Sequence, residues 1–408
     1  MKRIHEELKK LATFSASENP SVTRILYYKE DLAARAYFIG LCKEEGLTVR
    51  VDAIGNTFAR WEGTHPELPA IGTGSHIDAI PLSGQYDGTV GVFGGLAAIR
   101  YLKSIDFKPT RSIEILLFTA EEPTRFFIGC LGSRMLSGQL KAQDAEKLSD
   151  KDGFFLNDAR AQAGFTGDLN SVVLSNDYYH AFVELHIEQG PRLEKEGLDI
   201  GIVTKIAAPS SLRVKLTGEG GHAGAVLMPI RKDAGVAGAE IMLAVERIAI
   251  ESASDDTVAT TGIFDILPRA VNSIPKEAYL EIDLRDTNIE TRNKALKDLE
   301  NEIATICKRR NIQYSVELVN CDPPAICDEK IINIAENVTR ELQYSYKKMV
   351  SYAYHDSLFM AQVFPTTMIF IPSKGGVSHR PDEYSSPEEI EKGVMVLALT
   401  LKKLSAGV

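Results

Sequence analysis

The 408-residue sequence has few cysteines, no excess of basic charge and no long apolar run. Its five cysteines are dispersed and form no Cys-x-x-Cys pair, so neither a disulfide framework nor a cysteine-rich zinc site is indicated. The formal net charge of −10 argues against nucleic-acid binding, which depends on a basic surface. No segment approaches the roughly 20 apolar residues that a membrane span needs. These absences predict a soluble protein with no nucleic-acid or membrane partner and leave a small-molecule ligand open.

The N-terminal residues also lack the apolar core of a secretory signal. Ile4, Leu8 and Leu11 instead recur at helical spacing among charged residues, which predicts a short amphipathic helix. As the chain stands, a cytoplasmic location is expected. A chain from which a signal had been removed would look the same, so the secretory pathway, including the endoplasmic reticulum, remains open.

Two patterns of apolar residues divide the chain. From about residue 70 to 190, and again after residue 327, apolar runs alternate with helical patterns, as in an α/β layered domain. They predict a strand over 70–80, a helix over 133–140 and a last helix that opens with a capping box of Ser386 and Glu389 around Pro387. Between these two regions, strictly alternating strands and two helices follow in the order β-α-β-β-α-β, which is typical of a ferredoxin-like unit. The second of these helices, over 289–309, carries an apolar stripe of Leu296, Leu299, Ile303 and Ile306. We therefore predict a mixed-sheet, three-layer α/β domain from residues 1–210 plus 327–408, interrupted by an inserted α+β domain at 211–326.

Among the eight histidines, His76 in "GTGSHIDAI" follows an apolar run and precedes Asp78 by two residues. Residues i and i+2 of an extended segment share a face, so Asp78 can fix the tautomer of His76, as a metal-bound imidazole requires. An ordinary hydrogen-bonded pair is the alternative. Asp87 in "SGQYDGTVGVFGG" stands just before a helical pattern, where a helix N-cap is also expected. The glycines there do not have the G-x-G-x-x-G spacing of a nucleotide loop.

Glu121 and Glu122 follow the apolar run "SIEILLF" and precede Pro123. Neighbours on a strand point to opposite faces, so both acids reach one site only if the strand has ended, and the proline indicates that it has. An exposed acidic turn is the alternative.

In "HAFVELHIEQG", His186 shares a strand face with Glu184 and Glu188. A buried core histidine is the alternative to a ligand, but the flanking carboxylates favour a metal. His379 in "SKGGVSHRP" again follows a strand. The mixed imidazole and carboxylate set suits two divalent ions with one bridging carboxylate and one glutamate left as a base. It comprises His76, Asp87, Glu122, His186 and His379.

From about residue 20 to the C-terminus, the chain resembles the dinuclear amidohydrolases of the M20 peptidase clan. The resemblance is to the branch that holds N-carbamoyl-L-amino-acid hydrolases, allantoate amidohydrolases and ureidoglycolate amidohydrolases. It rests on motifs in the family's order, namely "GSHIDAIPLSGQYDG", "TAEEPTRF", "ELHIEQGP", "GGHAGA", "NSIP", "DLRD", "YHDSLFMA" and "GVSHRPDEYSSPE".

The resemblance implies a role for each matching residue. His76 and His186 would bind one metal, Glu122 and His379 the other, and Asp87 would bridge them, with Asp78 orienting His76. Glu121 would be the general base, and His222 would steady the developing oxyanion, often from the neighbouring subunit. Substrate contacts are expected from Gln189, His222, Asn272, Arg285, Tyr354 and His355. Two divalent ions per subunit are implied, manganese being favoured and zinc possible, and the insert would be a lid and the dimerisation domain of a homodimer.

Arg285 also has support from the pattern of its own strand. It ends an alternating strand whose polar face also carries Glu281 and Asp283, and a guanidinium suits bidentate binding of a substrate carboxylate. A surface salt bridge is the alternative.

Two departures from the branch bear on the substrate. "GHAGAVLMP" and "YAYHDSL" differ from the "GHAGTTPM" and "GAGHDA" of carbamoylases and allantoate enzymes, and resemble plant-type ureidoglycolate amidohydrolases. We therefore expect hydrolysis of the ureido C–N bond of (S)-ureidoglycolate to glyoxylate, ammonia and carbon dioxide. Allantoate and N-carbamoyl-L-amino acids are the alternative substrates. A metal-free binding or scaffold relative is disfavoured because every ligand position is filled.

Overall fold

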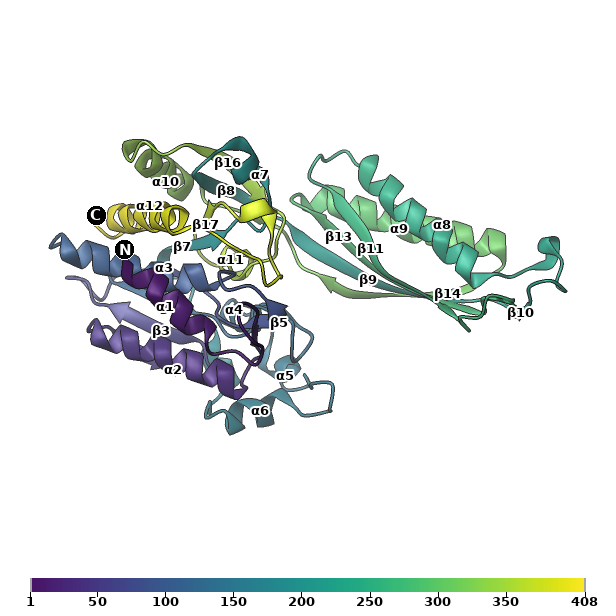
Figure 1. The fold of residues 1–408 in the computed structure, drawn as a ribbon, viewed down its shortest axis with the longest axis horizontal. Coiled ribbons are helices and arrows are strands. Elements are labelled where there is room, and N and C mark those ends of the chain that lie inside the picture. The colour runs from purple at the N-terminus through teal and green to yellow at the C-terminus, as the bar shows by residue number, and fades with distance from the viewer. Residues whose placement is uncertain (1, 407–408) are drawn as a thin grey trace. The chain divides into compact units, whose positions relative to one another are not determined.

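The computed structural model describes residues 2–406 and divides the chain into two compact units (Figure 1). The outer unit runs to Thr204 and resumes at Ile326, and the inserted unit covers Lys205–Ala325. Among the described helices, none combines the length and the apolar character that crossing a bilayer requires.

A nine-stranded mixed sheet forms the centre of the outer unit. Its order is β15-β8-β17-β7-β4-β6-β3-β2, with β16 paired to β8. The central strands β17, β7, β4 and β6 are parallel neighbours, while β3, β2 and β8 pair antiparallel. The strands are β2 (Thr48–Val51), β3 (Thr57–Trp61), β4 (Ala70–Ser75), β6 (Ile113–Leu117), β7 (Tyr179–Ile187), β8 (Ile200–Ile206), β15 (Ala325–Ile326), β16 (Tyr346–Ser351) and β17 (Thr366–Ile371).

Strand β7 shows that helices cover both faces of this sheet. Leu185 packs onto Gly94 of α3 and Gly393 of α12 on one face. Glu184, its neighbour in the strand, points to the other face and accepts a hydrogen bond from Ser357 of α11. Successive strand residues face opposite ways, so the outer unit has three layers, as predicted. Both faces of β6 are buried, which explains why its sequence is an unbroken apolar run apart from Glu114.

The helices of the outer unit include a confirmed capping box at the start of α12, where Ser386 and Glu389 cap each other's backbone and Pro387 is the first helical residue. They are α1 (Lys2–Ala12), α2 (Lys29–Glu44), α3 (Thr89–Ser104), α4 (Leu131–Leu136), α5 (Ala142–Ala145), α6 (Leu156–Gln162), α7 (Arg192–Glu196), α10 (Glu329–Glu341), α11 (Asp356–Met360) and α12 (Pro387–Ser405). Strands β1 (Val22–Arg24) and β5 (Ala79–Ser83) form a separate two-stranded antiparallel sheet.

The inserted unit is ferredoxin-like. Its four-stranded antiparallel sheet has the order β11-β13-β9-β14, and α8 and α9 pack on it. The alternating residues of β9 point their apolar side chains into this core, together with the predicted stripe of α9. The elements are β9 (Ala208–Thr217), α8 (Ala234–Ile250), β11 (Val258–Leu267), β13 (Glu277–Asp286), α9 (Ile289–Arg310) and β14 (Gln313–Cys321), with a small pair β10 (Gly221–His222) and β12 (Ser273–Ile274). The predicted fold class is confirmed.

Three details differ from the sequence expectations. The predicted strand over residues 70–80 is broken at 76–78, where the chain leaves β4 before β5 begins. The helix expected over 133–140 ends at Leu136. The inserted unit begins at Lys205 instead of residue 211, because Ala208, Pro209 and Ser210 already pair with β13. These three residues are all buried, so they lack the alternation that marks the rest of β9.

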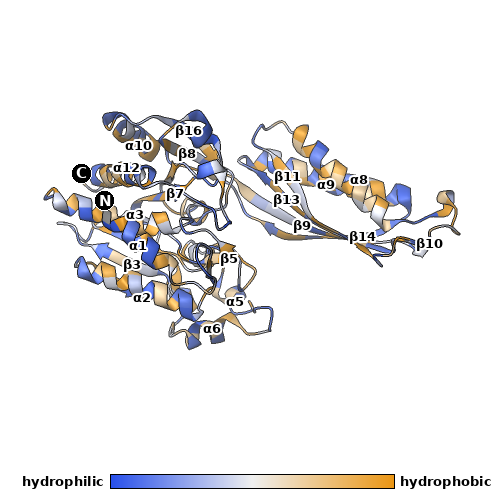
Figure 2. Ribbon diagram, viewed as in Figure 1, coloured by the Kyte–Doolittle hydropathy of each residue, from blue (hydrophilic) through white to orange (hydrophobic). Residues whose placement is uncertain are grey.

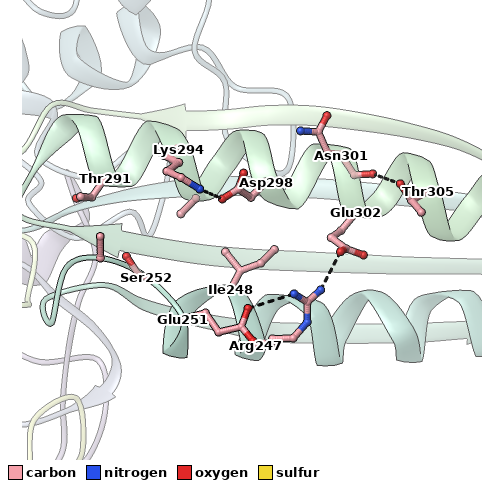
Figure 3. Close-up of a pocket in the computed structure, with 12 residues that line it drawn as sticks. Arg247, Ile248, Glu251, Ser252, Thr291, Lys294, Asp298, Asn301, Glu302 and Thr305 are labelled. Atoms are coloured by element: carbon pink, nitrogen blue, oxygen red, sulfur yellow. Dashed lines mark hydrogen bonds and ion pairs between the residues drawn. The ribbon is translucent and has the colours of Figure 1, made fainter.

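An open groove of about 390 Å³ lies between α8 and α9 (Figure 3). Arg247 crosses it to reach Glu302 at 2.9 Å and also pairs with Glu251 at 3.3 Å. Lys294 pairs with Asp298 along the other helix. The charged side chains of this groove therefore bind one another and link the two helices of the insert.

Candidate metal centre

The five residues expected to bind metal lie at one edge of the sheet of the outer unit. The carboxyl ends of β4, β6, β7 and β17 meet at this edge because the four strands are parallel. His76 directly follows β4, His186 is the penultimate residue of β7, Glu122 follows β6, His379 follows β17, and Asp87 precedes the first turn of α3.

Asp87 is the hub of the group. Its Oδ1 lies 3.2 Å from Nε2 of His186 and 3.7 Å from Nε2 of His76. Its Oδ2 lies 3.1 Å from Nε2 of His379, and that nitrogen is 3.3 Å from Oε1 of Glu122. The donor atoms thus form two groups that share one carboxylate, and within each group they lie within 4.8 Å of one another.

The hydrogen bonds of the imidazoles indicate that this space suits cations. Nδ1 of His186 is 2.9 Å from the carbonyl oxygen of Ile187, and Nδ1 of His76 is 3.1 Å from that of Asp78. A carbonyl oxygen only accepts, so each Nδ1 carries the proton and a neutral ring has a lone pair on Nε2. Both lone pairs would then face the Asp87 carboxylate, and that of His186 also accepts the backbone N–H of Gly88 at 3.1 Å. Protons or metal ions between the imidazoles and Asp87 would relieve the remaining repulsion. The donor set of three imidazoles and two carboxylates fits divalent ions.

The shifted pKa values of His76 and Asp87 also indicate that positive charge is favoured at this site. Burial lowers the pKa of His76, but Glu121, Asp78 and Asp87 outweigh burial and raise it well above its usual value. Burial raises the pKa of Asp87, but the hydrogen bonds of the three imidazoles outweigh burial and hold it well below its usual value. The Asp87 carboxylate is therefore anionic and surrounded by groups that either take up protons or bind a cation.

A tight turn brings both neighbouring acids to the site. Ala120 has a φ of 53°, a left-handed conformation that redirects the chain after β6. The carboxylate of Asp78 then accepts the backbone N–H groups of Glu121 at 3.3 Å and Glu122 at 3.0 Å. Asp78 also approaches His76, with 3.6 Å between Oδ1 and Nδ1. One buried aspartate therefore organises the segments that carry three of the expected site residues.

The two acids are held differently within this turn. Glu122 faces His379, whereas Oε2 of Glu121 lies 3.7 Å from Nε2 of His76 and its Oε1 accepts a weak hydrogen bond from the thiol of Cys130 at 3.6 Å. Burial raises the pKa of Glu121 well above its usual range; His76 opposes this shift and Glu122 adds to it. A raised pKa makes Glu121 a stronger base than an exposed carboxylate.

Three further expected residues of the outer unit surround the same centre. Gln189 donates from Nε2 to Oδ2 of Asp87 at 2.8 Å. His355 is buried and packs edge-on against the ring of His186, with 4.5 Å between ring centroids. Tyr354 accepts a hydrogen bond from Arg134 through its hydroxyl group. Gln189 and His355 thus touch residues that are expected to bind metal. Tyr354 directly precedes His355 in the chain.

The remaining expected residues lie in the inserted unit, at opposite ends of its sheet. Exposed His222 pairs with Ser273 across β10 and β12, and Asn272 accepts the N–H of Ala223, so His222 and Asn272 lie close together. Arg285 is near the far end of β13 and is bound bidentately by Asp283 at 2.8 and 3.0 Å. The salt bridge considered from the sequence is therefore present in this structure.

Sequence reasoning overlooked some residues at the site and overvalued another. Glu383 and Ser378 hydrogen bond to the Asp87 segment, and both stand in the quoted motif "GVSHRPDEYSSPE". Asp356, in "YHDSLFMA", is buried and accepts a hydrogen bond from Ser133. Glu188, thought to flank a metal, instead accepts the N–H groups of Arg192 and Leu193 at the start of α7. The burial and the hydrogen-bond partners of a side chain distinguish residues at the site from those outside it. The residue type alone does not.

Comparison with known proteins gives the same family throughout. The model of peptidase family M20/M25/M40 matches residues 72–403. A ureidoglycolate hydrolase of Arabidopsis thaliana is 53% identical over 98% of this chain and 86% of its own length. An allantoate amidohydrolase of Bacillus subtilis is 35% identical over 98% of this chain and 97% of its own length.

A solved structure extends the similarity to the whole fold. The crystal structure of AtUAH in complex with glyoxylate has a TM-score of 0.89 and 52% identity, and the match covers 100% of this chain and 98% of that chain. A complex of AtUAH with (S)-hydroxyglycine matches equally well. The expected family is therefore confirmed.

The position of Asp78 generates a first prediction. Asp78→Asn should weaken Mn²⁺ binding by about 10–100-fold, because the carboxylate that accepts the two N–H groups and lies 3.6 Å from His76 loses its charge and one acceptor oxygen. Chelator competition on metal-stripped protein measures this. Asp152→Asn, at an exposed position, is the matched control. If the Asp78 variant binds metal as tightly as the control, Asp78 does not organise the site.

Proposed function

Since the chain belongs to peptidase family M20/M25/M40, we propose that it is an amidohydrolase that cleaves the ureido C–N bond of (S)-ureidoglycolate. The observation that carries the substrate is the 53% identity, over 98% of the chain, to a ureidoglycolate hydrolase. Glyoxylate and (S)-hydroxyglycine, bound in the AtUAH structures, are the compounds that this cleavage would yield. The allantoate amidohydrolase is a more distant relative at 35% identity, so allantoate is the second candidate substrate.

Membership of the family implies divalent metal binding, and we propose two ions per subunit. His76 and His186 would hold one, Glu122 and His379 the other, and Asp87 would use one oxygen for each. When bound, such ions polarise a carbonyl group and lower the pKa of a bound water. Imidazole and carboxylate donors accept manganese or zinc, and we propose manganese as the metal with which to test the site.

The chain's own groups supply the proton transfers. Glu121 takes a proton from the attacking water, whose oxygen bonds to the ureido carbonyl carbon. His222 stabilises the charge that develops on the carbonyl oxygen. The C–N bond then breaks as Glu121 returns the proton to the departing nitrogen. Carbamate and hydroxyglycine result, and they decay to carbon dioxide, ammonia and glyoxylate.

The geometry of the inserted unit supports a homodimer. Strand β13 runs from the end next to His222 and Asn272 to the end that carries Arg285. At about 3.4 Å per residue, the eight steps from Glu277 to Arg285 span about 27 Å, far longer than a small ureido acid. His222 and Arg285 of one chain therefore cannot contact the same substrate molecule. If both residues contact substrate, they belong to two copies of the chain.

The inserted unit also exposes an apolar surface suited to a second copy. Val236, Leu243 and Ile250 of α8 recur at intervals of seven residues and are 44, 64 and 76% exposed. Figure 2 shows the hydrophobic colouring along α8. The adjoining β11 is an edge strand with exposed Val258 and Ile263. A long apolar edge strand favours pairing with another chain, and we propose that this surface forms the dimer.

An ammonia-release assay with added Mn²⁺ separates the candidate substrates. We expect kcat/KM for (S)-ureidoglycolate to exceed that for allantoate and for N-carbamoyl-L-amino acids by about 100-fold, because the chain is more similar to a ureidoglycolate hydrolase than to the allantoate enzyme. Faster turnover of either alternative would reassign the substrate within the family. Absence of bound metal and of all three activities would instead favour a binding or scaffold protein.

Glu121→Gln tests the base. The variant should keep its metal ions, because Glu121 is not proposed as a ligand, and kcat should fall by about 10²–10⁴-fold because the proton acceptor is lost. Metal analysis and steady-state kinetics on the same preparation check both parts. Near-normal turnover with full metal content would show that another group is the base.

Mixing two inactive variants tests the shared site. If Arg285 and His222 serve different copies, a heterodimer of Arg285→Ala and His222→Ala contains one intact site. Random exchange of subunits at equal amounts should then restore about a quarter of wild-type activity. No recovery, with subunit exchange verified by differently tagged chains, would remove at least one of the two residues from the substrate site.

A further inference from the structure

Glu383 is a buried carboxylate at the metal centre for which neither metal binding nor catalysis provides a role. It lies in the loop between β17 and α12, four residues after His379, and is 4% exposed. Its Oε1 accepts the backbone N–H groups of Tyr86 at 2.8 Å and Asp87 at 3.0 Å. The loop that carries one expected ligand therefore holds the backbone of another, almost 300 positions away in the sequence.

The second oxygen of Glu383 reaches the side chain of Asp87 through a serine. The hydroxyl group of Ser378 lies 2.8 Å from Oε2 of Glu383 and 2.9 Å from Oδ2 of Asp87. Gln189 donates to both Ser378 and Asp87, at 3.2 and 2.8 Å. Oε1 of Glu383 thus accepts two backbone N–H groups, while Oε2 shares the single hydroxyl proton of Ser378 with Asp87. This places Glu383 to act on Asp87 and not to bind an ion itself.

The backbone conformation of His379 requires contacts that hold it in place. His379 has a φ of 59°, in the left-handed region, which costs a non-glycine residue about 1–2 kcal/mol. Such a conformation persists only when the surroundings enforce it. Ser378 on one side of His379 and Glu383 on the other are both bonded to the Asp87 segment.

The Asp87 loop is shaped to admit Glu383. A Cβ at Gly84 would lie 2.3 Å from Cβ of Glu383, so only glycine allows this approach. The contact therefore depends on a residue in each loop, Gly84 in one and the buried Glu383 in the other.

We infer that Glu383 is a positioning residue that sets the bridging carboxylate of Asp87 and the left-handed His379 so that both face the same ion. The inference rests on the metal centre of the proposed function. The contacts of Glu383 with the Asp87 segment are of the outer-shell kind that orients a ligand and tunes its affinity for metal. Glu383 contributes to metal binding without touching metal or substrate.

Titration of metal-stripped protein with Mn²⁺ alone tests this role. Glu383→Ala should weaken binding of the ion at Glu122 and His379 by about 10–100-fold. The metal-free variant should still fold, with a lower melting temperature because two buried N–H groups lose their acceptor. Glu383→Gln should lose less, since its amide oxygen can still accept the two N–H groups. Asp382→Ala is the matched control, because this neighbouring carboxylate is exposed and its side chain pairs with Arg380 at 2.7 Å.

Wild-type affinity for both ions in Glu383→Ala would overturn the inference. If that variant does not fold, Glu383→Gln and Ser378→Ala provide the test. Weaker Mn²⁺ binding in both variants supports the positioning role of Glu383, and unchanged binding in both refutes it. Because no substrate is present, failure here is distinct from failure of the proposed ureidoglycolate activity. A wild-type protein that binds no Mn²⁺ would refute the metal centre itself.

Discussion

The charge of one buried carboxylate, Asp87, is the constraint on which the rest of the site depends. Three imidazole nitrogens and the amide of Gln189 face its two oxygens. Two of these imidazoles donate their other proton to a backbone carbonyl, so their remaining lone pairs face the same anion, and that of His186 also accepts the N–H of Gly88. Additional positive charge between the groups would stabilise this arrangement. The four parallel strand ends are the scaffold that fixes this arrangement, and the ligands come from segments far apart in the sequence.

Much of this site could be predicted from the sequence because strand ends are visible there. The apolar run before Glu121 and the proline after Glu122 correctly indicated a turn at the end of a buried strand. The alternation of β9 and the stripe of α9 predicted the ferredoxin-like insert. The roles of His76, Asp87 and the other expected ligands follow from the family resemblance, and their mutual distances are compatible with those roles.

The residues that escaped prediction act through partners distant in sequence. Glu383 stands in an ordinary polar loop, and nothing in its local pattern reveals that its carboxylate accepts the N–H groups of Tyr86 and Asp87. Glu188 shows the converse, since its regular spacing from His186 suggested a ligand while its oxygens cap a short helix. Periodicity identifies which face of an element is buried. It does not identify the partner of a buried polar group, which requires the tertiary structure.

The excess of acid at this centre links metal binding to folding. Burial raises the pKa of Glu121 well above its usual range and that of Glu122 and Glu383 to about 7, because each anion loses hydration and lies near other carboxylates. Ionising these groups in the metal-free protein is therefore costly, and they tend to bind protons instead. A bound divalent cation removes this cost because it balances their negative charge. An ion at a hundred times its Kd adds about 2.7 kcal/mol to the stability of the form that binds it. The acids that are costly to ionise in the metal-free protein thus make its stability increase when a divalent cation binds.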